Sequence, residues 1–432
     1  MRLFFILIAV SSVFAQQDTT IRLDVQQVLV PVVVTDKKGH HVAGLHASDF
    51  RVFEDGVQQE IASFSTDTAG SVDAVAALAQ SEHPLSSPRH TFVICVDTLH
   101  TAPASSARVR EALENLFEKE KTTDAQYVLI GIGRQLQMIQ TATTNPMAIL
   151  VKLRSAAFRN ALAGSDGSAL SSQLQSIRTR MDDFCKRCTC GSRQSRGNCD
   201  SEIDALKQSV DAEAERWTAP FNALTEQFRN VVAELGKLPT RRTLILISDG
   251  FNIQPKRDFY AVVSTYLPDR PQFKLSDDEK NDLRDVLKLA TDRNITIDTI
   301  DSRGSAPASL NGGGLMDASA SGSRGGYSVI GTNNRPVAPS TRSAAEPSAA
   351  RNDSESSPSM EHLARETGGV YSRDSKEMLQ QFRSALADGR EYYMLAYVPL
   401  NKATDGKFRA ITVEARDKKL NIRAKTGYWA PQ

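Results

Sequence analysis

The chain has 432 residues, of which 40% are hydrophobic and 24% charged, so we expect a globular protein of two or three structural units. Lysine and arginine number 52, and aspartate and glutamate number 51. This balance gives neither the basic surface that binds nucleic acid nor a polybasic membrane surface, and we exclude DNA and RNA as partners.

The first residues have the pattern of an export signal. Met1 and Arg2 form a short positive start, and residues 3–14 are apolar but too few to span a bilayer. Val13-Phe14-Ala15 matches a small-x-small cleavage site, which predicts a signal peptide over residues 1–15. An N-terminal anchor is less favoured because the apolar run stops without a stop-transfer pattern. We predict a periplasmic or secreted protein with no membrane span.

Short strand-like runs separated by turns follow over residues 16–66. One of these turns contains His40 and His41, which we expect to be a solvated pair. Residues 67–90 lose this periodicity and carry serine and proline, which is typical of a linker.

From residue 91 to residue 390, apolar runs alternate with helical patterns. The expected strands include residues 92–96, 127–132, 244–247 and 295–300, and the expected helices include 103–121, 277–293 with Ser276 as N-cap, and 376–387. This alternation predicts an α/β fold with a Rossmann-like, doubly wound, mostly parallel sheet. Polar residues directly after such strands lie where open α/β sheets bind their ligands.

Two stretches interrupt this alternation. Residues 163–238 have a polar, helical pattern and read as an insertion, and residues 302–358 are so rich in small and polar residues that we expect a disordered loop. Strand patterns return over residues 391–432. Neither terminal segment has enough strands to be stable alone, so we predict that the two segments pack together as a small β-sandwich-like domain.

The insertion contains four cysteines, namely Cys185, Cys188, Cys190 and Cys199. Four sulfurs at this spacing can hold zinc, but an exported chain meets an oxidising compartment, which favours two disulfides. Three pairings are possible, and the sequence does not choose between them, although a Cys188–Cys190 bridge is disfavoured by its short loop. Cys95 lies within the first long strand and is expected to be a buried free thiol.

The order of these elements resembles a von Willebrand factor type A domain. The segments that carry the resemblance after the first strands are LILISDG at residues 244–250, ITIDTI at 295–300 and LARETGGVY at 363–371. A narrower resemblance, to exported VWFA-related proteins of acidobacteria, is carried by VPVVVTD at 30–36, DFRVFEDG at 49–56 and KTGYWAP at 425–431.

This resemblance implies a metal-ion-dependent adhesion site, in which oxygen ligands hold one divalent cation (Mg, Mn or Ca) that a partner protein's acidic group completes. The usual Asp-x-Ser-x-Ser motif corresponds here to Asp97-Thr98-Leu99-His100-Thr101. The residues that match or stand nearest to the family's ligands are Asp97, Thr101, Asp249, Ser165 and Ser168.

Leu99 has no oxygen where the first serine coordinates, so the site is degenerate. In the alternative interpretation, Asp97 and Asp249 hold no metal and cap turns and helix N-termini. We expect His100 to be an exposed turn residue, and we assign no role to Asp298 and Asp301.

No catalytic motif is present: the sequence has no Gly-x-Ser-x-Gly elbow, no His-Glu-x-x-His helix and no phosphate-binding glycine loop. The leading hypothesis is a non-enzymatic protein that binds a protein partner, in adhesion or envelope assembly, at the edge that contains Asp97 and Asp249. The alternatives are a metal-dependent hydrolase with His100 as general base, and a purely structural envelope protein.

Overall fold

The computed structural model describes residues 27–67, 89–121, 124–162, 165–188, 199–274, 283–303, 358–373 and 378–432. The predicted signal peptide, most of the predicted linker, residues 304–357 of the predicted loop and the predicted helix cap Ser276 lie outside the described residues. None of the helices in the described part of the chain combines the length and apolar character needed to cross a membrane.

A six-stranded sheet forms the larger unit. Its strands are β5 (His90–Asp97), β6 (Ala125–Ile132), β7 (Gln137–Thr143), β8 (Arg241–Ser248), β9 (Ile295–Asp301) and β10 (Tyr371–Ser372). They lie in the order β10-β9-β8-β5-β6-β7, and all neighbours are parallel except the antiparallel pair β6 and β7. The unit is therefore mixed α/β with a mostly parallel sheet, which is compatible with a Rossmann-like fold.

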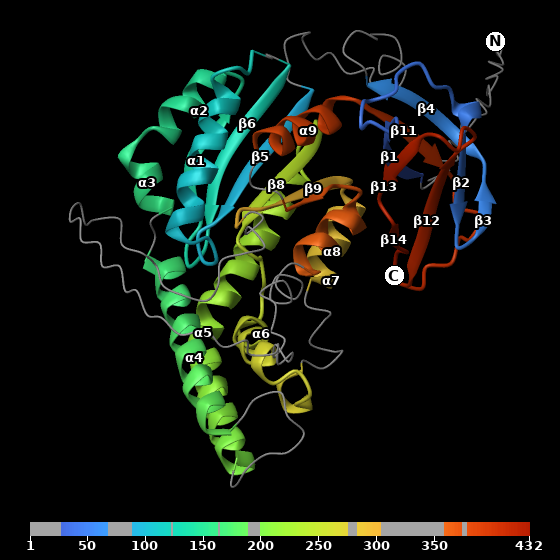
Figure 1. Ribbon diagram of the computed structural model, residues 1–432. Coiled ribbons are helices and arrows are strands. Elements are labelled where there is room, and N and C mark those ends of the chain that lie inside the picture. Colours follow the sequence, from blue (N-terminus) through green and yellow to red (C-terminus); the bar gives the residue numbers. More distant parts are fainter. Residues whose placement is uncertain are drawn as a thin grey trace, which may run out of the picture.

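Helices cover both faces of this sheet (Figure 1). One face carries α1 (Pro103–Phe117), α2 (Pro146–Leu153), α3 (Ala156–Leu162) and α9 (Met378–Arg390). The other carries α4 (Ser165–Cys188), α5 (Cys199–Leu235), α6 (Pro255–Tyr266), α7 (Arg284–Asp292) and α8 (Pro358–Thr367), with the short 3-10 turn η2 (Pro271–Phe273) after α6.

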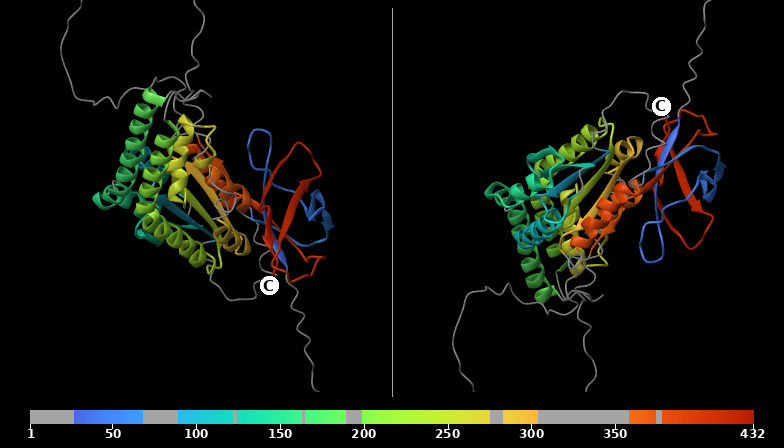
Figure 2. Two further views of the ribbon diagram at one scale, coloured as in Figure 1. Left: turned by 90° about the horizontal axis from the view of Figure 1, so that it is seen from below. Right: turned by 90° about the horizontal axis from the view of Figure 1, so that it is seen from above.

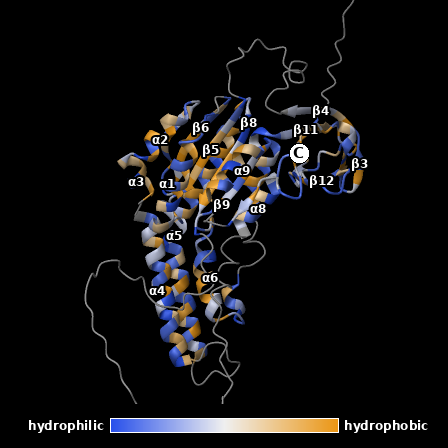
Figure 3. Cartoon of the chain, turned by 45° about the horizontal axis from the view of Figure 1, so that its top comes forward, coloured by the Kyte–Doolittle hydropathy of each residue, from blue (hydrophilic) through white to orange (hydrophobic). Residues whose placement is uncertain are grey.

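The central strands are apolar on both faces because both faces are buried. In β5, Phe92 and Ile94 pack into one core, whereas Val93 and Cys95 pack into the other. Figure 3 shows the same strands as the most hydrophobic part of the cartoon. Cys95 is a buried free thiol, as the sequence predicts.

The helical segment predicted as an insertion belongs to the core of the α/β unit. Phe221, Leu224 and Phe228 of α5 lie in the same buried cluster as Leu244 and Leu246 of β8. Their spacing of three and four residues places them on one face of the helix. This segment therefore covers one face of the sheet, in addition to extending beyond it together with α4 (Figure 1).

A disulfide joins the two long helices. Cys188 at the end of α4 is bonded to Cys199 at the start of α5, which is one of the pairings that the sequence left open. Cys185 is also disulfide-bonded, and Cys190 lies outside the described residues.

The terminal segments form two further sheets. The strands are β1 (Val28–Thr35), β2 (Phe50–Glu54), β3 (Val57–Gln59), β4 (Ile61–Asp67), β11 (Tyr392–Tyr397), β12 (Phe408–Ala415), β13 (Asn421–Ala424) and β14 (Gly427–Trp429), with the 3-10 turn η1 (Ala47–Asp49) before β2. Their orders are β13-β1-β11-β4 and β14-β12-β2-β3, so each sheet contains strands from both ends of the chain, and these alternate in the first sheet.

The two terminal sheets share one buried cluster. Val30 of β1, Val52 of β2, Leu395 of β11 and Ile411 of β12 all belong to it. The first and last parts of the chain lie side by side in both views of Figure 2. The two ends therefore depend on each other for a core, and the β-sandwich class predicted for them stays a prediction.

The motif KTGYWAP holds the terminal unit against the α/β unit. The Lys425 ammonium donates to the carbonyl oxygen of Thr291 at 3.0 Å and to Oδ1 of Asn294 at 2.8 Å. Next to it, the Thr426 backbone N–H donates to the Glu366 carbonyl oxygen at 3.2 Å. Residues that first stood out by resemblance thus have a structural role between the two units.

We expect Lys425→Met to change how stability depends on pH. Burial is the largest cause that lowers the pKa of Lys425 from 10.5 to about 8. The negative charge of Asp292 raises this pKa, and the positive charge of Arg241 lowers it further. Between these two pH values the unfolded chain binds a proton that the folded chain does not, so wild-type stability rises with pH, by about 3 kcal/mol. Urea unfolding measures the free energy of unfolding at pH 8 and at pH 10.5. From the lower to the higher pH this free energy should rise more in the wild type than in Lys425→Met. Equal pH dependence of the two proteins would contradict the prediction.

The expectation that His40 and His41 are both solvated is wrong for His41. His40 is exposed, with 75% of its side chain accessible, and pairs with Asp36 of its own turn. His41 instead places Nε2 at 2.7 Å from the carboxylate of Asp388 on α9, which also forms a 2.7 Å ion pair with Arg423. The turn packs on the α/β unit, and sequence spacing alone does not reveal that contact.

Candidate functional site

Three strands end in polar residues at one edge of the six-stranded sheet. Asp97 is the last residue of β5, Ser248 ends β8 just before Asp249, and Asp301 ends β9. Because β5 and β8 are parallel neighbours, with Val96 opposite Ile247, Asp97 and Asp249 follow adjacent strand ends. The sheet therefore brings the two predicted carboxylates to the same edge, where their partners differ.

Asp97 is fully buried and all its contacts are internal. Its Oδ1 accepts hydrogen bonds from the backbone N–H groups of Leu99 (2.9 Å) and His100 (3.1 Å). Its Oδ2 lies 2.5 Å from Nδ1 of His100 and accepts a hydrogen bond from the Ser248 hydroxyl at 2.8 Å. Four polar groups thus surround one carboxylate that caps its own turn.

His100 is buried, so the expectation of an exposed turn residue is wrong. Only 5% of its side chain is accessible, and its Nε2 lies 3.3 Å from Oδ2 of Asp258 on α6. Its ring contacts Phe221 edge-on, with ring centroids 5.0 Å apart. Burial alone lowers the pKa of His100, but Asp97 and Asp258 outweigh that effect and raise the pKa from 6.5 to about 10. The ring is therefore a positively charged link between two buried carboxylates.

Asp249 caps helix α1 from a distance. Its Oδ2 accepts hydrogen bonds from the Ala102 N–H (2.9 Å) and the Ser105 hydroxyl (2.8 Å), and its Oδ1 accepts from the Ser302 hydroxyl (2.6 Å). Ala102 is the N-cap residue and has no side-chain acceptor, so Asp249 supplies the carboxylate at this helix start, a position that the helix dipole favours. Burial raises the pKa of Asp249, although these three donors act against it.

The remaining predicted ligands lie near this edge. Thr101 is buried, and its hydroxyl has no hydrogen-bond partner among the described residues. Ser165 is the first residue of α4 and Ser168 follows one turn later. A Cβ atom on Gly167 would lie 2.5 Å from the Thr101 carbonyl oxygen, so the start of α4 packs directly on the turn that follows β5.

These residues fit a divalent cation poorly. Such an ion takes about six oxygen ligands, and the Leu99 side chain, which is fully buried in the core, contains no oxygen to offer. Both Asp97 oxygens and both Asp249 oxygens already accept hydrogen bonds, which leaves the Thr101 hydroxyl as the one buried orphan oxygen of the predicted set. Within the described residues no cluster of three His, Cys, Asp or Glu side chains could hold a metal.

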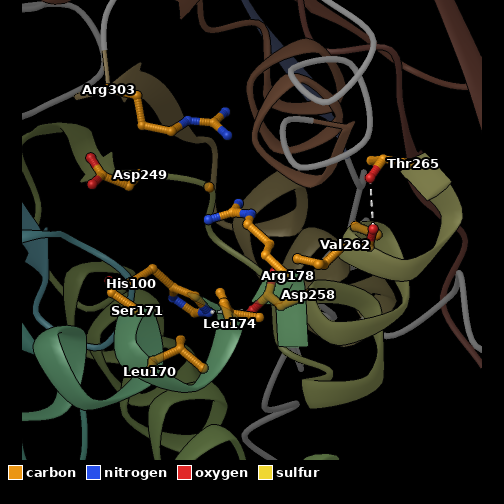
Figure 4. A pocket seen from close by; sticks show the side chains of 12 residues that line it. His100, Leu170, Ser171, Leu174, Arg178, Asp249, Asp258, Val262, Thr265 and Arg303 are labelled. Carbon is orange, nitrogen blue, oxygen red and sulfur yellow. Dashed lines mark hydrogen bonds and ion pairs between the residues drawn. The ribbon is translucent and has the colours of Figure 1, made fainter. Parts of the chain in front are cut away.

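A cavity of about 300 Å³ opens beside this cluster (Figure 4). Its charged lining consists of His100, Arg178, Asp249, Asp258 and Arg303, and its apolar lining includes Leu170, Leu174 and Val262. Arg178 is an exposed residue of α4, whereas Arg303 forms a 2.6 Å ion pair with Asp301. The side chains of Arg178 and Arg303 extend into the space beside Asp249, as Figure 4 shows.

Sequence reasoning missed four residues of this edge. Ser302 and Arg303 directly follow β9, so the rule that polar residues after a parallel strand face the ligand could have found them. Asp258 lies in the first turn of α6, and Arg178 lies on α4. No local signal marks these two, because their position depends on how the helices pack on the sheet.

No protein-family model matches the chain, and no curated protein matches it. Among solved structures it is similar to an aerotolerance-related membrane protein from Bacteroides fragilis NCTC 9343 with multiple mutations to serines, at 9% identity, TM-score 0.29 and coverage of 69% of this chain and 98% of that one. It is also similar to the conserved hypothetical protein BatB from Bacteroides thetaiotaomicron, at 11% identity, TM-score 0.26 and coverage of 68% and 98%. A third similarity, to proximal thread matrix protein 1 of the mussel byssus, has 8% identity, TM-score 0.28 and coverage of 70% and 48%. The class of the chain, a mixed α/β protein with a mostly parallel sheet, therefore rests on its own strands and helices.

Proposed function

We propose that this protein is an exported, non-enzymatic protein of the von Willebrand factor type A kind, which binds a protein partner at the cavity beside Asp249. The observation that carries the proposal is the position of that cavity outside the carboxyl ends of β5, β8 and β9. Ligands of open α/β sheets bind at this place. Charged and apolar side chains line it together, as in the contact surfaces of transient protein complexes. In the same proposal the two terminal sheets form a β-sandwich-like domain.

Arg178 is the residue that we expect to contact the partner. It is exposed, it lines the cavity, and it lies on a helix whose start packs on the turn after β5. Arginine is enriched at the centres of protein interfaces because its planar guanidinium forms several hydrogen bonds at once.

The hydrolase hypothesis is less favoured by the surroundings of His100. A general base needs a ring nitrogen with a lone pair that faces the substrate. Nδ1 of His100 faces Asp97, and Nε2 faces Asp258, so neither nitrogen is directed to a substrate. The structural-envelope hypothesis differs from the binding hypothesis in needing no ligand at the cavity. Partner capture by the wild type, compared with capture by one cavity variant, distinguishes the two.

We expect Arg178→Glu to weaken partner capture strongly and to leave the fold intact. Replacing an exposed positive charge by a negative charge at the cavity should weaken binding at least about tenfold, which corresponds to about 1.4 kcal/mol. The measurement is cross-linked capture from the envelope fraction, with the bound proteins identified by mass spectrometry, in buffers with and without a chelator.

Lys186→Glu is the matched control for this experiment. Lys186 lies on the same helix, 74% of its side chain is accessible, and it is about 12 Å further along the axis. The same charge change at this position should leave capture unchanged. Equal capture by the wild type and Arg178→Glu would contradict the proposed binding site, and capture of no protein by the wild type would favour the structural hypothesis.

A further inference from the structure

The imidazole ring of His100 is fixed between two carboxylates that come from different elements. Asp97 ends β5, and Asp258 lies in the first turn of α6. The ring is 2.5 Å from one carboxylate and 3.3 Å from the other, and the rings of Phe221 and Phe251 lie at centroid distances of 5.0 and 6.3 Å from it. Acidic groups therefore face both ring nitrogens, and aromatic groups pack against the ring.

This cluster needs a positive charge at its centre. The side chains of Asp97 and Asp258 are 0% and 9% accessible, so water solvates neither carboxylate well. Two buried negative charges side by side destabilise a fold unless a cation lies between them. A histidine whose two nitrogens face carboxylates supplies that cation without any ion from solution.

We propose that His100 takes the place of the divalent cation of an adhesion site, so that this edge of the sheet works without metal. The ring joins Asp97 to α6 as a metal would join its ligands, and it occupies the Oδ2 atom of Asp97 that a metal would need. The fully buried Leu99 agrees with this assignment, since a side chain without oxygen costs nothing where no ion is bound. The inference rests on the proposed function only because it takes this edge of the sheet as the binding site. The experiment that tests the inference needs no partner protein.

The test compares the wild type with His100→Ala in metal-free buffer and in millimolar Mn²⁺. We expect the wild type to take up no Mn²⁺, measured by the electron paramagnetic resonance signal of the free ion, and to melt at the same temperature in both buffers. His100→Ala leaves Asp97 and Asp258 facing an empty space, and it should take up one Mn²⁺ per chain and melt at a higher temperature with the ion than without it. His40→Ala, which removes an exposed histidine from another turn, should behave like the wild type.

Two results would overturn the inference. One is uptake of one Mn²⁺ per wild-type chain that Asp97→Asn abolishes, and the other is a folded His100→Ala variant that ignores Mn²⁺. Should His100→Ala fail to fold by itself, it is refolded with millimolar Mn²⁺ or imidazole. If the variant folds with either compound, the result supports a cation position at residue 100. If it folds with neither compound, the inference is overturned. The Mn²⁺ experiment does not affect the capture experiment with Arg178→Glu. The proposed binding site and its proposed independence from metal can therefore be disproved separately.

Discussion

Asp97→Ala is expected to lower the free energy of unfolding by about 3–5 kcal/mol, the range for removing one partner from a buried ion pair. The change removes the acceptor of two backbone N–H groups and of the Ser248 hydroxyl. It also leaves the charged ring of His100 with Asp258 alone, at the longer of its two distances. Urea unfolding followed by far-ultraviolet circular dichroism measures the loss.

Asp36→Ala is the matched control, because Asp36 has nearly the same local contacts at the surface. Its carboxylate accepts hydrogen bonds from the N–H groups of Lys38 and His40 and lies 3.2 Å from the His40 ring. Water replaces these contacts once the side chain is removed, so we expect a much smaller loss of stability. Similar losses in the two variants would show that burial of the Asp97 cluster contributes little.

Asp388→Ala is expected to loosen the terminal unit from the α/β unit, with a loss of about 3 kcal/mol. Asp388 is buried on α9, and its carboxylate pairs with His41 and with Arg423 of β13, each at 2.7 Å. Removing it leaves Arg423 at the contact between the units with buried Asp298 as its nearby negative group, and takes from His41 the carboxylate that raises its pKa. The chain has two tryptophans, and they allow the effect to be located.

Trp217 lies on α5 in the core of the α/β unit, and Trp429 lies on β14 and packs against the same core from the terminal unit. We expect Trp429 fluorescence to change at a lower urea concentration than Trp217 fluorescence in Asp388→Ala, and at the same concentration in the wild type. Single Trp→Phe variants assign each signal. Glu414→Ala, which breaks the half-exposed 2.8 Å pair with Arg51 inside the terminal unit, should cost at most about 1 kcal/mol and leave the two signals coincident. Coincident signals in Asp388→Ala would contradict a role between the units.

Local sequence pattern predicted most of the α/β unit. Runs such as residues 92–96 and 244–247 are short and apolar throughout, which is typical of a strand buried on both faces. The same pattern placed Asp97 and Asp249 at strand ends. Because parallel strands point the same way, strand direction alone brought these two carboxylates to one edge of the sheet.

The pattern was a weaker guide wherever a residue's environment comes from distant segments. The residues 163–238 looked like an insertion because many of their positions are polar, yet one face of α5 completes the core of the sheet. An amphipathic helix shows in its own sequence that it has a buried side, and does not show what that side covers.

The sequence by itself therefore determined the strands, the buried Cys95 and the edge at which polar residues collect, since these depend on residue spacing and chain direction. Only the tertiary structure decided what that edge contains. His100 is buried and charged because α5 and α6 bring Phe221 and Asp258 against it, and Asp249 caps α1 because β8 lies beside β5. Burial and charge pairing depend on contacts between segments far apart in the chain, and residue spacing carries no information about them.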